Sequence, residues 1–393
     1  MLIGLVGKPN VGKSTFFKAA TLSDVLIANY PFATIKPNHG IGYVKIPCID
    51  KEFNVQCNPR TGSCINHIRF VPVDLMDVAG LVEGASEGKG LGNQFLDDLS
   101  KADLFIQIVD ISGTTDSGGR EGKGDPIEDV RMLENELDLW YLGILSKVWK
   151  AFARALQQKK ENFARAVAKQ FSGLKVSEED VKEVLIKLNL DGERPADWSD
   201  LQLKQFARGL RIKTKPMIIA ANKVDKQGGK ENLEKLKQVY TDTLIIPCSA
   251  DSELALREAK KAGLIEYVPG ENHFNIIEGK VNEKQKAALE SIKKNVLDAF
   301  NSTGIQEILN KAVFDFLRYI AIFPAGAKLS DSKGNILPDC FLMPPGTTAL
   351  DFAFKLHTDI GNNFVKAIDA RTRLPIGKDH KLKHRDGIEI MTK

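Results

Sequence analysis

One stretch decides the fold of this chain: Gly7-Lys8-Pro9-Asn10-Val11-Gly12-Lys13-Ser14. It follows an apolar run at residues 2–6, which predicts a strand, and it leads into a helical pattern with Phe16, Phe17 and Ala20. A G-x-x-x-x-G-K-[ST] pattern between a strand and a helix is typical of a phosphate-binding P-loop. Its glycines let backbone N–H groups turn toward phosphate oxygens, and the helix N-terminus adds a partial positive charge.

The P-loop pattern assigns roles to single residues. We expect Lys13 to reach the β- and γ-phosphates and the Ser14 hydroxyl to ligate Mg²⁺. The predicted phosphate-binding residues are Gly7, Pro9, Asn10, Val11, Gly12, Lys13, Ser14 and Thr15.

A second polar group follows another apolar run, residues 70–76, which predicts a buried strand that ends at Asp77. An aspartate there can hold Mg²⁺ through a water molecule, and the N–H of Gly80 can contact the γ-phosphate. Lys13 and Gly80 are therefore candidate catalytic groups.

The base-recognition signal comes much later, where the apolar residues 217–221 are followed by Asn222-Lys223-Val224-Asp225. The Asp225 carboxylate can accept the N1–H and the exocyclic N–H of guanine, which adenine does not offer. Sites of this kind discriminate by roughly 10⁴-fold or more. The next predicted strand ends at Cys248, and we expect backbone N–H groups of Ser249 and Ala250 to meet the guanine O6. Ligands bind outside the carboxyl ends of strands in such sheets, where all these residues fall.

Composition sets wider limits. The chain has 393 residues, too many for one ordinary core, and a net charge of +4, too small to imply a nucleic-acid partner by itself. It has no apolar run long enough to span a membrane and no basic segment before its first strand, so we expect a cytoplasmic protein. Its five cysteines form no C-x-x-C pair, which favours reduced thiols.

A long section without nucleotide motifs separates the two halves of the site. Asp125 and Pro126 predict the start of a helix whose apolar residues recur at helical spacing as far as Phe152. Ser177 and Ser199 predict two further helix starts. Residues 116–124 are polar and glycine-rich, and we expect a flexible connection there. The basic residues of this section are Lys147, Lys150, Lys159, Lys160, Arg165 and Lys169, and they face either RNA or solvent.

The pattern changes again from about residue 320. The sequence predicts a short strand at 340–343 and a helix that is opened by residues 345–351, runs through His357 and ends at 359–361. It further predicts a strand at 365–369, and a turn followed by a last strand at 386–390. Six basic residues gather near the end: Lys378, His380, Lys381, Lys383, His384 and Arg385. They predict a contact with a phosphate backbone, with solvated loop side chains as the alternative.

Two segments give the chain a family resemblance. Residues 29–38 (NYPFATIKPN) and residues 77–96, a glycine-rich run that begins DVAGLVEGA, resemble the Obg family of translation-factor GTPases, and most closely archaeal relatives of its YchF subfamily. The resemblance implies an α/β P-loop GTPase domain, a mostly parallel sheet with helices on both faces, a helical insertion and a C-terminal β-grasp TGS domain. The corresponding boundaries are 1–115 and 213–319 for the GTPase domain, 116–212 for the insertion and 320–393 for the TGS domain.

The resemblance also implies further roles near the phosphates. Thr34 matches the switch I threonine that closes over Mg²⁺, and residues 80–92 match a mobile switch II. Leu81 stands where Ras-like enzymes place a glutamine that orients water, which implies slow turnover. Asn10 matches an asparagine that helps to hold K⁺ in some relatives; the alternative is that it only stabilises its own turn.

Specificity and partners follow from the same comparison. ATP-preferring YchF proteins lack the aspartate that this chain keeps at Asp225, so GTP with Mg²⁺ is expected. The implied partners are the ribosome or ribosomal RNA and an unidentified translation or exchange factor, with no membrane. Two alternatives stay open: an ATPase of the Obg-like type, and a scaffold on the ribosome or RNA with negligible turnover.

A cluster of three cysteines and one histidine is not explained by the nucleotide-binding motifs. Cys48, Cys57, Cys64 and His67 fall within twenty residues and include the ligand types of zinc. Their spacing is irregular, so free thiols, a zinc site and a Cys57–Cys64 disulfide remain the alternatives.

Overall fold

The protein is described by a computed structural model that covers residues 1–21, 38–78, 80, 100–159, 161–326, 329–331 and 333–393. These residues form a central seven-stranded sheet with the order β2-β4-β1-β5-β6-β7 and with β3 paired to β4. The strands are β1 (Leu2–Val6), β2 (His39–Pro47), β3 (Ser63–Ile65), β4 (Ile68–Asp77), β5 (Leu104–Asp110), β6 (Met217–Asn222) and β7 (Ile245–Pro247). The expectations for Thr34, Leu81 and the rest of residues 81–92 lie outside the described residues.

Five neighbouring strands of this sheet, β4, β1, β5, β6 and β7, run parallel. Both β5 and β6 are buried at every position, as expected of strands covered on both faces. Because the five strands are parallel, their carboxyl ends lie at one edge of the sheet. This edge carries Asp77, Asp110 and Asn222, the last residues of β4, β5 and β6. The antiparallel strands β2 and β3 extend the sheet beyond β4.

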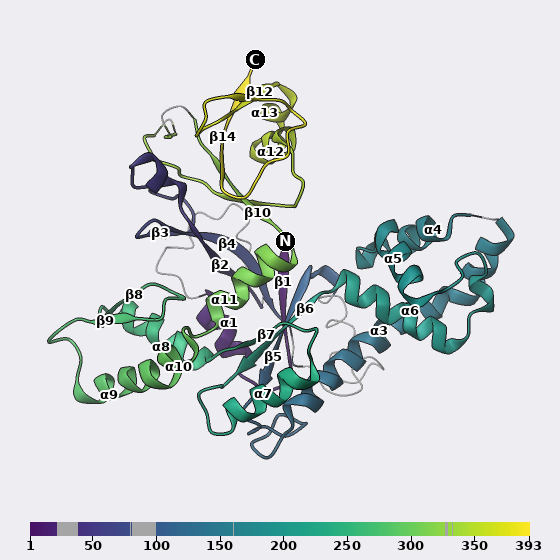
Figure 1. The fold of residues 1–393 in the computed structure, drawn as a ribbon, viewed down its shortest axis with the longest axis horizontal. Coiled ribbons are helices and arrows are strands. Elements are labelled where there is room, and N and C mark those ends of the chain that lie inside the picture. Colours follow the sequence, from purple (N-terminus) through teal and green to yellow (C-terminus); the bar gives the residue numbers. More distant parts are fainter. Residues whose placement is uncertain (22–37, 79, 81–99, 160, 327–328, 332) are drawn as a thin grey trace.

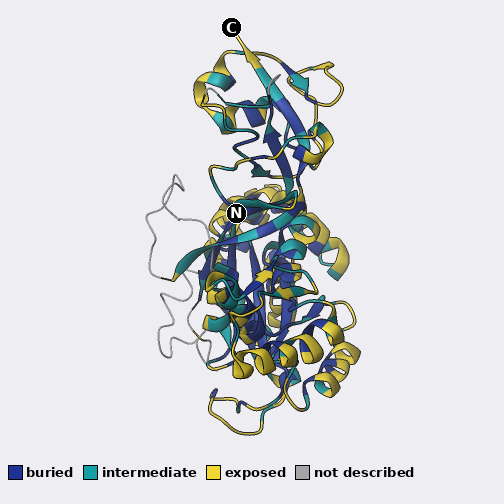
Figure 2. Cartoon of the chain, turned by 90° about the vertical axis from the view of Figure 1, so that its left-hand side faces the viewer, coloured by how far each residue is buried: buried dark blue, intermediate teal, exposed yellow. Residues whose placement is uncertain are grey.

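Helices cover both faces of the sheet, which confirms the predicted α/β fold class (Figure 1). On one face, α1 (Lys13–Thr21), α8 (Ala250–Lys261) and α11 (Ile305–Asn310) bury apolar side chains such as Phe16 and Ile308. On the other face lie α3 (Pro126–Lys159) and α7 (Gly229–Val239). Dark blue in Figure 2 marks the buried residues, which follow the central sheet.

Helix α3 continues past the sheet into a helical arm (Figure 1). The arm adds α4 (Phe163–Gln170), α5 (Glu178–Leu188) and α6 (Asp200–Thr214), with short 3₁₀ turns at Ser172–Leu174 and Pro195–Asp197. The capping boxes predicted at Ser177 and Ser199 are present. The core of the arm contains an aromatic cluster: Trp149 and Trp198 have ring centroids 5.2 Å apart, and Phe206 packs against both rings.

The connection into α3 differs from the prediction. Residues 113–124 form a hydrogen-bonded hairpin in which Thr115 bridges Glu121 and the Gly124 N–H donates to Gly113 O at 2.9 Å. Gly124 is required there because a Cβ would lie 1.9 Å from Thr115 O. In place of the expected flexible connection the structure has a hydrogen-bonded hairpin, in which Gly119 and Gly124 allow close backbone approach.

A smaller extension follows α8. It contains β8 (Ile265–Tyr267), β9 (Phe274–Ile276), α9 (Glu283–Ile292), a π-helical turn at Lys293–Leu297 and α10 (Asp298–Phe300). A second π-helical turn, Lys311–Phe316, follows α11.

The C-terminal domain has a separate five-stranded sheet in its described part, with the order β11-β10-β14-β12-β13. Its elements are β10 (Ile320–Pro324), β11 (Phe341–Met343), α12 (Ala349–Leu356), α13 (Thr358–Asn362), β12 (Phe364–Asp369), β13 (Pro375–Ile376) and β14 (Asp386–Thr392). Phe352 of α12 is buried in the core of this domain. Residues 359–361, expected only to end a helix, lie in the separate short helix α13.

The C-terminal domain rests on an excursion of the central sheet, residues 47–65, which we call the docking platform. It contains the 3₁₀ turn Ile49–Phe53 and β3. Glu52 of the platform forms ion pairs with Arg371 and Arg385. Backbone N–H groups of Asn58 and Arg60 donate to Ile336 O at 3.0 Å and Pro338 O at 2.9 Å.

None of the described helices combines the length and the apolar character that crossing a membrane requires.

Candidate nucleotide-binding site

The P-loop has the backbone that its glycines predict. Gly7 and Gly12 adopt φ angles of +153° and +92°. A Cβ at Gly12 would lie 2.3 Å from Asn222 Nδ2, and one at Gly7 would lie 2.5 Å from Ile108 O. Asn10 also has a positive φ, +64°. Helix α1 begins at Lys13, so its first N–H groups stand at the end of the loop where phosphate is expected.

Lys13, Ser14 and Asp77 come together at the ends of β1 and β4. Lys13 Nζ lies 3.5 Å from Asp77 Oδ1, and Ser14 Oγ donates to Asp77 Oδ2 at 3.3 Å. Asp77 Oδ1 is buried and accepts no hydrogen bond from the described residues. A hydroxyl and an incompletely satisfied carboxylate are the hard oxygen donors that suit Mg²⁺. Gly80 is also close, since a Cβ there would lie 3.2 Å from Pro9 Cγ.

Asn222 connects the P-loop to the loop after β7. Its Nδ2 donates to Val11 O at 2.8 Å, and its Oδ1 accepts the Ala250 N–H at 3.0 Å. Asn222 is buried, with 3% of its surface exposed, and holds the two loops together. Lys223 also reaches back, because its Nζ donates to Asn10 O at 3.0 Å.

The Asp225 carboxylate is available to accept hydrogen bonds from a nucleotide base. Its side chain is 15% exposed, and its one partner among the described residues is Lys226 Nζ, 3.7 Å away. The predicted O6 contact finds less support: the Ser249 N–H donates to Thr303 O and the Ala250 N–H to Asn222 Oδ1. Ser249 instead caps helix α8 through its side chain.

The comparisons with known proteins agree with this geometry. An uncharacterized GTP-binding protein of Methanocaldococcus jannaschii is 49% identical over 395 residues, covering 100% of this chain and 99% of the relative. The family model described as "Obg-like GTPase YGR210-like, G4 motif-containing domain" matches residues 220–326, the "50S ribosome-binding GTPase" model matches residues 2–137, and the TGS domain model matches residues 321–392. The chain belongs to the Obg-like (YchF) GTPase family.

Other relatives of this Obg-like protein are named after different nucleotides, ATP or GTP. The Bacillus subtilis "Ribosome-binding ATPase YchF" is 29% identical, with 93% of this chain and 87% of the relative covered. A crystal structure of a GTP-binding protein from Pyrococcus horikoshii superposes with a TM-score of 0.78 at 40% identity, with all of both chains covered. The Schizosaccharomyces pombe YchF structure, at a TM-score of 0.60 and 23% identity, supports the fold alone and covers 100% of this chain and 97% of that one.

Asp110 is a site residue that we did not predict. Its buried carboxylate accepts hydrogen bonds from Ser112, Thr115 and Lys223 Nζ, the last at 2.8 Å. Burial raises the pKa of Asp110, but hydrogen bonds from Lys223 and Ser112 outweigh it and leave the pKa below its ordinary value. A carboxylate at the end of a mostly apolar strand is the signal used for Asp77, and it would have found Asp110 as well.

Lys8 forms a second unpredicted contact, from the P-loop to the helical arm. Its Nζ lies 2.7 Å from Asp129 Oδ2 and donates to Thr115 O at 2.9 Å. The Lys8 side chain is 1% exposed and that of Asp129 11%. Burial raises the pKa of Asp129 although Lys8 acts against it. In this Obg-like fold the first turn of α3 is therefore fixed to the phosphate-binding loop.

Two members of the predicted basic cluster are occupied within the protein. His384 Nδ1 accepts the Ala321 N–H at 3.2 Å, and its ring packs on Phe314 at a centroid distance of 4.9 Å. Arg385 donates to Pro47 O at 2.8 Å and pairs with Glu52. The surface left for an outside phosphate consists of Lys378, His380, Lys381 and Lys383, which are exposed.

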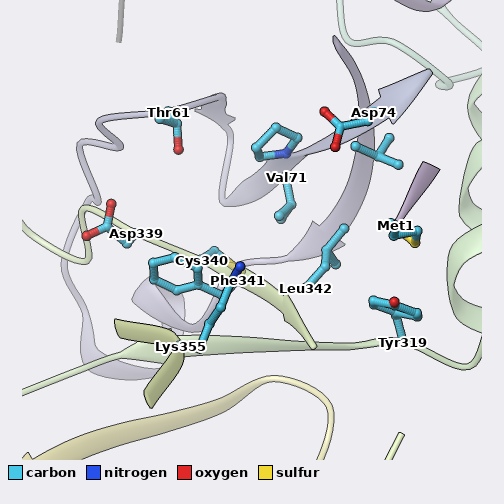
Figure 3. A pocket seen from close by; sticks show the side chains of 12 residues that line it. Met1, Thr61, Val71, Asp74, Tyr319, Asp339, Cys340, Phe341, Leu342 and Lys355 are labelled. Carbon is cyan, nitrogen blue, oxygen red and sulfur yellow. The ribbon is translucent and has the colours of Figure 1, made fainter. Parts of the chain in front are cut away.

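A separate cavity lies where the C-terminal domain meets the central sheet (Figure 3). Its lining includes Asp74, Tyr319 and Lys355. Burial raises the pKa of Asp74. The four predicted metal-ligand candidates also lie away from the nucleotide site: the three cysteines are in the docking platform, and His67 is in the turn before β4.

Substituting Asn222 by alanine is expected to weaken nucleotide binding. The change would remove both hydrogen bonds that join the P-loop to the loop after β7 and leave Val11 O and the Ala250 N–H unpaired. Each buried unpaired group costs about 1–3 kcal/mol. We expect Kd for nucleotide, measured by titration of a fluorescent GTP analogue, to rise about tenfold or more. An unchanged Kd with lower thermal stability would show that Asn222 acts on folding alone.

Proposed function

We propose that this chain is a Mg²⁺-dependent GTP-binding and GTP-hydrolysing switch protein that works with the ribosome. The observation that carries the choice of GTP is the Asp225 carboxylate, which follows β6 and whose one ion-pair partner among the described residues is the exposed Lys226. A buried pocket that presents a carboxylate favours a base with two adjacent N–H donors, as guanine has.

Phosphate binding and hydrolysis would depend on few groups. Lys13 and the P-loop N–H groups would hold the β- and γ-phosphates, and Gly80 would offer its N–H to the γ-phosphate. Ser14 and Asp77 would hold Mg²⁺, with Thr34 as a further proposed ligand from outside the described residues. The bound ion supplies neutralisation of phosphate charge. Leu81 offers no group to orient a water molecule, so we expect slow turnover by the isolated protein.

Asn10 supports a further proposal, a K⁺ requirement. Its Nδ2 donates to Gly119 O at 2.8 Å, while none of the described residues donates to its Oδ1. An amide oxygen at the P-loop is a suitable ligand for a monovalent cation beside the phosphates. The side chain also fixes the 113–124 hairpin, which is the alternative role.

The ribosome is proposed as partner from the names of relatives and from the TGS domain. The B. subtilis relative is named a ribosome-binding ATPase, and a matching family model is described as a 50S ribosome-binding GTPase. The exposed basic residues 378, 380, 381 and 383 offer a surface for a phosphate backbone. Cosedimentation with ribosomes at rising salt concentration tests the proposed contact. A variant in which all four of these basic residues are replaced by neutral ones should bind ribosomes more weakly at low salt.

The experiment that tests the function compares GTP and ATP on the full chain. We expect GTP to compete with a bound fluorescent GTP analogue far better than ATP, and phosphate release from GTP in KCl to exceed that in NaCl. Lys13→Ala should abolish release. Equal or better competition by ATP would favour the Obg-like ATPase alternative. Nucleotide binding without phosphate release, with or without ribosomes in KCl, would favour the scaffold.

A further inference from the structure

Four potential metal-ligand side chains converge in the docking platform: Cys48, Asp50, Cys57 and Cys64. One donor atom from each lies within 4.8 Å of the other three. The Cys48 and Cys57 sulfur atoms are 3.6 Å apart, and Cys64 Sγ is 3.7 Å from Asp50 Oδ2. The chain brings them together by folding back: β2 ends before Cys48, the 3₁₀ turn carries Asp50, and Cys64 lies on β3.

The sulfur separation fits one shared metal ion. Thiolates bound at about 2.3 Å to a tetrahedral zinc ion lie about 3.8 Å from each other. A disulfide would need about 2.05 Å, and all five cysteines of the protein are free in the structure. Buried thiols are common in cores. A fully buried carboxylate beside such thiols is uncommon, and the Asp50 carboxylate, with 0% exposure, lies among the three cysteines.

The fourth donor differs from the one expected from sequence. His67 is not in the four-residue set; its Nδ1 instead lies 2.9 Å from Asp50 Oδ1. The other oxygen, Asp50 Oδ2, accepts the Cys57 N–H at 3.0 Å. A histidine that holds a ligating carboxylate in place is the kind of outer contact that metal sites use to orient their ligands.

A buried positive charge completes the surroundings. Zinc with three thiolates and one carboxylate carries a net charge of −2. The Arg69 side chain is almost fully buried, and its Nη1 donates to Cys57 Sγ at 3.5 Å. The same guanidinium donates to Leu337 O and Pro338 O, both at 3.0 Å. Arg69 would therefore offset part of the charge and join the site to the segment between β10 and β11 of the C-terminal domain.

We infer that Cys48, Cys57, Cys64 and Asp50 form a structural zinc site that fixes the docking platform beneath the C-terminal domain. The set supplies four ligands and leaves no open position for a substrate, as in other structural sites. The ion would tie three cysteines from a stretch with little regular structure, on which Glu52, Asn58 and Arg60 hold the C-terminal domain. The inference does not depend on the proposed GTP hydrolysis.

Metal analysis of the full chain tests the site directly. Protein purified under reducing conditions is expected to contain about one zinc ion per chain by mass spectrometry. Exchange with Co²⁺ should give the strong visible absorption of a tetrahedral site and a sulfur-to-cobalt charge-transfer band. These measurements on the unmodified protein need no variant to fold. Absence of metal with five reactive thiols after denaturation, or with three because a disulfide has formed, would overturn the inference.

Variants separate the ligands from their neighbours. Cys64→Ser and Asp50→Asn each remove a ligand and should lower zinc affinity by more than about 100-fold, beyond the loss typical of an outer contact such as His67. His67→Gln should keep one zinc and the cobalt spectrum, and Cys340→Ala is the matched control, since it removes a buried thiol of the same interface outside the donor set. A cobalt spectrum changed by His67→Gln but not by Asp50→Asn would reject Asp50 as the fourth ligand.

The structural role has its own readout. Removal of zinc from the wild-type chain should speed proteolytic cleavage near residues 337–340, where Arg69 and Arg60 anchor the segment between β10 and β11 of the C-terminal domain. Nucleotide affinity should change little, because the P-loop and Asp225 lie elsewhere. Cleavage at an unchanged rate after complete zinc removal would refute the role in fixing the platform.

Discussion

Replacing Asp225 by asparagine is expected to lower GTP affinity by about 10³-fold, because two hydrogen bonds from guanine to a charged carboxylate would be lost. ATP affinity should stay nearly constant, since adenine offers no donor pair to this position. Competitive titration of both nucleotides against the same fluorescent analogue measures the change.

The Asp225 prediction also includes a nucleotide that the variant should bind more tightly, one whose base is xanthine. Xanthine has a carbonyl where guanine has its exocyclic amine, so an asparagine amide can donate to it. Asp225→Asn should therefore bind xanthosine triphosphate better than the wild type does. Asp242→Asn, at an exposed turn, is the matched control and should change neither affinity. Comparable binding of GTP and ATP by the wild type, with no effect of Asp225→Asn, would contradict guanine recognition.

Breaking the buried Lys8–Asp129 pair is expected to destabilise the protein by about 3 kcal/mol. Lys8→Met leaves the Asp129 carboxylate buried without its charged partner. Asp129→Asn likewise leaves the Lys8 ammonium buried without its charged partner. Burial already raises the pKa of Asp129, which shows that desolvation acts against its charge even with Lys8 present. Urea denaturation followed by circular dichroism measures the loss.

The double variant Lys8→Met/Asp129→Leu distinguishes a charge effect from a packing effect. Two apolar side chains of similar volume remove both buried charges, so most of the loss should be recovered. Arg131→Met, which breaks an exposed pair with Glu128 in the same turn of α3, serves as control and should cost less than about 1 kcal/mol. Additive losses in the double variant would show that the two side chains act independently.

Much of the fold follows from local patterns. The P-loop glycines, the apolar runs that end at Asp77 and Asn222, and the capping boxes at Ser177 and Ser199 occupy the elements predicted for them. These features depend on backbone conformations and hydrogen bonds between residues only a few positions apart. Burial on both faces also makes a strand such as β6 visible as a continuous apolar run.

The parts that the sequence did not reveal are contacts between distant residues. Asn222 has the position expected of it, but its amide holds two loops together. The glycine-rich residues 113–124 form a hairpin against Pro9 rather than a loose connection, since a Cβ at Gly119 would lie 2.6 Å from Pro9 O. Spacing alone does not show whether a glycine supplies freedom or room for close approach.

The sequence by itself therefore determined the phosphate-binding loop, the strand ends that surround it, and the family to which the chain belongs. The tertiary structure alone decided that Lys8 pairs with Asp129, that Asp50 rather than His67 joins the three cysteines, and that Arg385 faces the docking platform. The physical reason is that a ligand set or a buried ion pair depends on which side chains share one desolvated space. That space is created only when the sheet, the arm and the C-terminal domain pack together.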